Sequence, residues 1–140
     1  MAMDPSSPLV ACLAFGALTL FHILPVVIFR VVMVNKGQMQ TTDVVKTRNS
    51  DETTFIGRVG CSHVNCLENL PLFTLVVVVN CLVDGAPDIS RKAWWYVYAR
   101  MLQIVVHWTS VSDRAVVVRF HCFMTQVFLL LSMAYETMFA

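Results

Sequence analysis

The side chains best suited to chemistry lie at the start of a segment that continues as purely apolar sequence. The segment is RVGCSHVNCLENLPLF, which begins at Arg58. On a helix, Arg58, Ser62 and Asn65 recur at i, i+4 and i+7, and Asn69 follows at i+11, so these four side chains form one stripe. Glu68 lies beside it. Ionisable residues inside a membrane span are costly and usually face a bundle interior or a water-filled cavity. The pattern therefore predicts a polar site.

A second stripe has the same spacing further along the chain. Tyr96, Arg100, Gln103 and His107 recur at i, i+4, i+7 and i+11. Residues at this spacing share one face of a helix. Two neighbouring helices with polar stripes at the same depth indicate a shared site rather than two unrelated polar positions.

Arginine is in excess over acid in this set. Arg30, Arg58, Arg100 and Arg114 accompany a single carboxylate, that of Glu68. An uncompensated positive site attracts an anion, and the planar guanidinium group suits a carboxylate. Nearby cations also stabilise a thiolate, so a thiol bound there would lose its proton more readily.

The same residues also have structural explanations, which the sequence leaves open. Arg30, Lys36 and Arg114 lie near predicted helix ends, where long cationic side chains extend to the lipid headgroups. The two asparagines of the first stripe can form hydrogen bonds between helices. Glu68 can form an ion pair with Arg58 or with the arginine of the second stripe.

The composition predicts a single membrane domain covering residues 1–140. Hydrophobic residues make up 57% of the 140 and charged residues only 14%, whereas soluble domains carry roughly 25% charged residues. Residues 5–29 contain no charge, and about 20 apolar residues suffice to cross a bilayer as a helix. The net charge of +1 gives no reason to expect a nucleic-acid partner.

The pattern of apolar runs predicts an all-α bundle of four transmembrane helices. Their predicted ranges are residues 8–34, 53–83, 92–109 and 113–138. Ser112 or Asp113 is expected to cap the last helix. Four spans place both termini on one side, and the opposite side carries most of the arginines and is therefore expected to be cytoplasmic.

Cysteine and histidine give no separate chemistry. The five cysteines are an odd number and lie mostly in apolar stretches, which argues against a disulfide framework. Cys61, His63 and Cys66 point in different directions on a helix, so they cannot converge on one ion and no metal site is predicted. His22 and His121 are interpreted as packing residues or as partners in hydrogen bonds between helices.

Three pieces of the sequence resemble a known family, the membrane-associated proteins in eicosanoid and glutathione metabolism (MAPEG). The segment RVGCSHVNCLENLPLF is similar to the second-helix pattern R-x-x-R-A-x-x-N-x-x-E-x-x-P, and the matched residues are Arg58, Asn65, Glu68 and Pro71. The segment YARMLQIVVHW resembles the third helix at Arg100. The pieces SDRA and LSMAYE resemble the fourth helix, with Arg114 at its start, and the second piece is similar to the tail of microsomal glutathione transferase.

The resemblance implies a left-handed bundle that assembles as a homotrimer in a membrane. It implies that glutathione binds between subunits near the cytoplasmic face and that a lipophilic small-molecule substrate enters from the lipid. The implied glutathione-binding residues are Arg30, Arg58, Asn65, Glu68, Arg100, Gln103 and His107. Arg114 would stabilise the glutathione thiolate. The implied location is the endoplasmic reticulum or another endomembrane in a eukaryote, or the inner membrane in a bacterium.

The sequence departs from the family pattern at several positions. Cys61 replaces the second arginine of the motif, and Val64, Ala115 and Val118 stand where some members carry polar groups. These departures disfavour a prostaglandin E synthase. Two hypotheses stay open: a glutathione transferase or peroxidase, which is favoured, and a non-catalytic protein of the same fold that binds a lipid or anionic ligand or modulates a partner. A transport bundle with a polar conduction path is a third hypothesis, which a trimer with sites between subunits disfavours.

Overall fold

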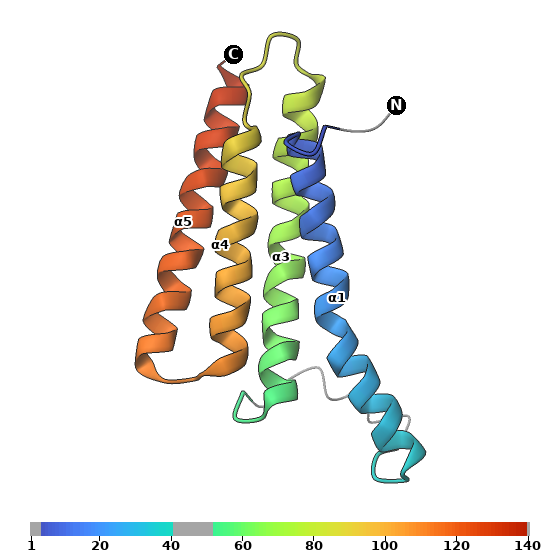
Figure 1. The fold of residues 1–140 in the computed structure, drawn as a ribbon. Helices are drawn as coiled ribbons and strands as arrows, with labels where there is room; N and C mark the ends of the chain where they lie inside the picture. The colour runs from blue at the N-terminus through green and yellow to red at the C-terminus, as the bar shows by residue number, and fades with distance from the viewer. Residues whose placement is uncertain (1–3, 41–51, 140) are drawn as a thin grey trace.

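A computed structural model describes residues 4–40 and 52–139, and within these ranges the chain is helical with no strand. The four helices are α1 (Pro8–Asn35), α3 (Phe55–Leu82), α4 (Ser90–Thr109) and α5 (Asp113–Met138) (Figure 1). The predicted all-α fold is therefore confirmed. Each helix end lies within two residues of its predicted position, and α4 shows one of the largest differences because it begins at Ser90 rather than at residue 92.

Short polar side chains fix where three of the helices begin. The hydroxyl oxygen of Ser7 accepts a hydrogen bond from the backbone N–H of Leu9 at 3.3 Å, and that of Thr54 accepts one from Gly57 at 3.0 Å. Ser112 does the same for Ala115 at 3.4 Å, which confirms it as the cap of α5. Each bond satisfies one of the N–H groups that a helix start leaves without a partner.

The helices form two packed pairs, α1 with α3 and α4 with α5, and α3 also packs against α4 (Figure 1). Both termini lie at one end of the bundle, as four crossings require. At the other end α1 diverges from α3. Pro25 lies within α1, and an internal proline removes a helical hydrogen bond and favours a kink.

The outer surface of the bundle is apolar. α1, α3 and α5 are each long and apolar enough to cross a membrane. Leu20, Leu82 and Phe128 are exposed on them by 70% or more. α4 has 20 residues, which correspond to about 30 Å at 1.5 Å per residue, and it runs alongside α5 (Figure 1). All four helices are therefore long enough to span the same apolar layer.

Three aromatic rings hold α1, α3 and α4 together. Phe73 stacks on Tyr96 with ring centroids 4.3 Å apart and an angle of 7° between the planes. Phe15 meets Phe73 edge-on at 5.7 Å. All three side chains are fully buried. Because lipid chains are as apolar as these rings, their contribution comes from close packing rather than from escape from water.

We expect Phe73→Ala to destabilise the bundle strongly. The substitution leaves a cavity between three helices, and Phe→Ala in soluble cores costs about 3–5 kcal/mol. The membrane value is expected at the lower end, because no transfer from water is lost. Unfolding followed by circular dichroism in detergent measures the change. Leu72→Ala is the matched control, since Leu72 is 55% exposed, and an equal loss in both variants would contradict the role of the aromatic cluster.

The two lone histidines differ. His22 is buried, and its Nε2 accepts a hydrogen bond from Trp108 Nε1 at 2.9 Å, which joins α1 to α4 as predicted. For His121 the prediction is wrong within the described chain. Its ring is exposed, and its Nδ1 lies 2.8 Å from the carbonyl oxygen of Val117 in its own helix.

Candidate functional site

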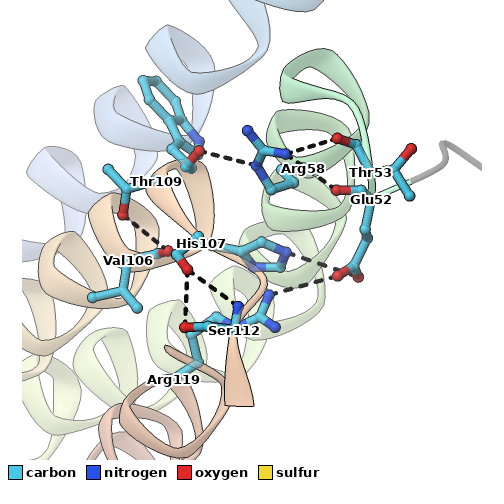
Figure 2. Close-up of polar contacts among 10 residues, drawn as sticks. Glu52, Thr53, Arg58, Val106, His107, Thr109, Ser112 and Arg119 are labelled. Carbon is cyan, nitrogen blue, oxygen red and sulfur yellow. Dashed lines mark hydrogen bonds and ion pairs between the residues drawn. The ribbon is translucent and has the colours of Figure 1, made fainter. Parts of the chain in front are cut away.

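Glu52 joins two helices at the end of the bundle opposite the termini. Its carboxylate oxygens lie 3.9 Å from His107 Nε2 on α4 and 3.7 Å from Arg119 Nη1 on α5 (Figure 2). These distances are those of ion pairs rather than of short hydrogen bonds. The residue precedes α3, so the contacts draw the start of α3 toward α4 and α5.

Arg58 binds backbone carbonyl groups of its own chain. Its Nε donates to the carbonyl oxygen of Trp108 at 3.0 Å, and its Nη1 donates to those of Thr53 at 3.0 Å and Glu52 at 3.3 Å (Figure 2). The last carbonyl groups of a helix lack partners within it. Arg58 satisfies one near the end of α4 and so ties the start of α3 to that end.

Two glutamines connect α4 to α5 inside the bundle. Gln126 Nε2 donates to Gln103 Oε1 at 2.9 Å, and Gln103 Nε2 donates to the carbonyl oxygen of Arg119 at 3.3 Å. Both glutamine side chains are buried. Gln103 therefore contributes to helix packing in this chain, since both ends of its amide bind α5.

Arg100 is a buried cation with few partners. Its side chain is 1% exposed, and Nη1 donates to Asn65 Oδ1. The guanidinium carbon lies 5.6 Å from the centre of the Phe15 ring, a cation–π contact. Nε and Nη2 have no hydrogen-bond partner within the described ranges, and no carboxylate there forms an ion pair with Arg100.

Asn65, Glu68 and Asn69 form what we call the α3 polar face. Asn69 Nδ2 donates to the carbonyl oxygen of Asn65 at 2.8 Å and lies 3.4 Å from its Oδ1. Because Asn65 Oδ1 also accepts from Arg100, the oxygen is occupied and the amide NH₂ group remains available as a donor. Glu68 is exposed about 20 Å from the start of α3.

The structural ion pair that the sequence left open for Glu68 does not form in the part of the chain that is described. No ion pair there links it to Arg58 or Arg100. An exposed carboxylate at this depth of a membrane helix is energetically costly. The α3 polar face therefore places an unpaired carboxylate on the outer surface of the described span.

One chain does not bring all the predicted residues together. Arg100, Gln103 and His107 are buried, whereas Asn65 and Glu68 are accessible on α3. Arg114 is exposed at the start of α5, and Arg30 lies half-buried on α1. α1 and α5 flank the bundle on opposite sides (Figure 1), so these two arginines do not meet within a single chain.

A family model described as the MAPEG family matches residues 8–139, nearly the whole chain. The chain belongs to the MAPEG family. No curated protein and no solved structure matches it significantly. Membership of MAPEG and the apolar helices together make this an integral membrane protein with a four-helix fold.

Three residues outside the two predicted stripes also make polar contacts between helices. Glu52 contacts α4 and α5, Arg119 contacts Glu52, and Gln126 contacts Gln103. Arg119 and Gln126 are seven residues apart and so lie on one helix face. This spacing in the sequence could have identified both residues. Glu52 lies in the polar connection before α3 and is exposed, and no periodicity there indicates which side chain contacts α4 and α5.

Proposed function

We propose that the protein is a membrane-bound glutathione transferase or peroxidase that acts on lipophilic substrates. The observation that carries the proposal is the α3 polar face, where Glu68 is exposed at membrane depth beside the amide of Asn65. A carboxylate in contact with lipid is costly. A polar ligand that covers this face removes the cost, and membership of the MAPEG family supports glutathione as that ligand.

The chemistry of the available groups fits glutathione, which carries one ammonium group, two carboxylates and a thiol. The carboxylate of Glu68 matches the ammonium group. The hydrogen bonds of the Asn65 side chain are made by its oxygen. Its NH₂ group can therefore donate to a carboxylate of glutathione. Arg114 is exposed and provides positive charge for the sulfur, because a nearby cation favours the thiolate.

A homotrimer would assemble these groups. Within one chain Arg30 and Arg114 lie on helices at opposite sides of the bundle (Figure 1). A neighbouring copy can place its own arginine against the α3 polar face of the first. We therefore place the glutathione site between subunits, toward the end of the bundle that carries Arg58 and Arg114, and we take membrane lipid as the source of the lipophilic substrate.

In the reaction, the thiol of bound glutathione loses its proton to water, and the thiolate forms a carbon–sulfur bond with the electrophile as the leaving group departs. With a hydroperoxide, the thiolate takes the outer oxygen as the O–O bond breaks and the alcohol leaves, and a second glutathione then forms the disulfide and releases water. Glu68 and Asn65 hold the peptide in one orientation, which converts an encounter in the membrane into a reaction between positioned groups. Arg114 stabilises negative charge where it develops. Arg100 lies beneath the polar face and orients Asn65, so we assign it a positioning role.

A second candidate function is that of a non-catalytic family member that binds a lipid or an anionic ligand or modulates a partner. The observation in its favour is that three residues expected to bind glutathione already bind other groups of the same chain. Arg58 binds backbone carbonyl oxygens, Gln103 binds α5, and His107 faces Glu52. These side chains serve the bundle, which leaves fewer groups for glutathione than the family pattern implies.

Glutathione binding separates the two candidates. We expect saturable binding at millimolar concentration or tighter, and Glu68→Gln should weaken it about tenfold or more, because a charge-assisted hydrogen bond contributes roughly 1.5–3 kcal/mol. Equilibrium dialysis of detergent-solubilised protein provides the measurement. Glu136→Gln is the matched control, since Glu136 pairs with Lys92 at the other end of the bundle. Absence of saturable binding would favour the non-catalytic function.

A further inference from the structure

A groove of about 450 Å³ lies between α4 and α5 on the outside of the bundle. Its main lining residues are Trp95, Tyr98 and Leu102 of α4 and Val118, His121 and Thr125 of α5. The three α4 side chains are each more than half exposed. Unlike the buried Arg100 and Gln103 of the same helix, they face outward, and the groove lies on other helices than the α3 polar face.

The groove is uncharged and lies within the membrane-spanning part of the helices. None of the side chains that line it is acidic or basic apart from the imidazole of His121. His121 is eight residues and Thr125 twelve residues after the start of α5, which places them about 12 Å and 18 Å along the helix. A ligand with a charged group at that depth would have no counter-charge.

The two polar side chains on the α5 side of the groove, His121 and Thr125, are arranged to accept hydrogen bonds. His121 Nδ1 lies 2.8 Å from the carbonyl oxygen of Val117. A carbonyl group cannot donate, so Nδ1 carries a proton, and in the tautomer with a single proton Nε2 is an acceptor. The Thr125 hydroxyl donates its hydrogen to the carbonyl oxygen of His121 at 2.9 Å. Its lone pairs remain free, and the two acceptors lie one turn apart on one face.

We propose that this groove binds an uncharged membrane lipid that carries a hydroxyl group. The hydrocarbon part of the lipid lies against Trp95, Tyr98 and Leu102, and its hydroxyl donates to His121 Nε2, beside the hydroxyl oxygen of Thr125. The volume lies within the range of about 300–1,000 Å³ typical of ligand pockets. A hydrogen-bond acceptor at the lipid surface without a donor is costly, and a lipid hydroxyl supplies the donor that hydrocarbon lacks.

Quenching of Trp95 fluorescence by brominated lipids tests the proposal in phosphatidylcholine vesicles. The probes are a brominated long-chain alcohol and its methyl ether, which differ only in the donor. A brominated sterol and its methyl ether form a second pair, which distinguishes a rigid lipid from a flexible one. Because the chain has three tryptophans, the fluorescence of Trp95 is taken as the difference between the wild type and Trp95→Phe.

In at least one of the two pairs of probes, we expect the compound with the hydroxyl group to quench Trp95 at a mole fraction about fivefold lower than its methyl ether does. One hydrogen bond of about 1 kcal/mol implies this factor. His121→Phe keeps a ring of similar size and should abolish the difference, and Thr125→Val should reduce it. Leu131→Phe, on α5 outside the lining, is the control and should leave it unchanged. Equal quenching by alcohols and ethers would overturn the proposal, as would a preference that persists in His121→Phe. Protection of Trp95 from every probe would also overturn it, because another protein surface would then cover the groove.

Discussion

Replacement of Arg114 by alanine is expected to lower kcat/KM for glutathione conjugation by about 10²–10³-fold, the usual effect of removing one group that stabilises developing negative charge. The side chain is exposed in the first turn of α5. A cation there opposes the positive end of the helix dipole, so Arg114 is poorly placed for a stabilising role. Its removal should leave the melting temperature unchanged or slightly raised, and the loss of activity then reports on chemistry.

The measurement uses purified protein in detergent with glutathione and a chromogenic electrophile. The activity of Arg114→Ala should also need a higher pH for half its maximum, because the thiol would lose the nearby cation that favours its deprotonated form. Arg91→Ala provides the matched control, since Arg91 is also an exposed arginine but lies at the start of α4, at the opposite end of the bundle. Equal turnover by the wild type and Arg114→Ala would rule out the proposed transferase mechanism.

The positions of the helices could be predicted from the sequence because they depend on local signals. Long apolar stretches indicate α1, α3 and α5, and α4 is delimited by the polar turns on either side of it. Polar caps such as Thr54 and Ser112 set their starts. These effects act within a few residues of the chain, so the observed ends lie close to the predicted ones.

The candidate site could be predicted only in part, because helical periodicity identifies a face but not what the face meets. In the first stripe Ser62 is buried whereas Asn65 is half-buried. Glu68, beside the same stripe, is exposed rather than turned into the bundle. Arg58 binds a carbonyl oxygen near the end of α4, and this partner depends on where two distant helix ends meet. Such contacts are properties of the packing and carry no pattern in the sequence.

Replacement of Arg100 by leucine is expected to weaken glutathione binding about tenfold or more without lowering the stability of the bundle. The guanidinium group is 1% exposed, and Nη1 is the nitrogen with a hydrogen-bond partner, Asn65, in the described structure. Burial of an incompletely paired ion costs several kcal/mol, and an apolar side chain of similar size often restores or raises stability. Retention of such a cation therefore points to function. A residue with only a packing role would instead lower the melting temperature when replaced.

If Arg100 acts through Asn65, the effects of the two residues on glutathione binding should not add. We expect Asn65→Leu to weaken binding by a similar factor, and the double variant to be little weaker than either single variant, because neighbours that share one interaction show coupling in a double-mutant cycle. Dissociation constants from equilibrium dialysis, with melting temperatures measured in parallel, provide both readouts. Arg100→Lys retains the charge and one donor for Asn65, so it should recover part of the affinity. Full additivity, or a melting temperature that falls while glutathione affinity is kept, would show that Arg100 serves the bundle alone.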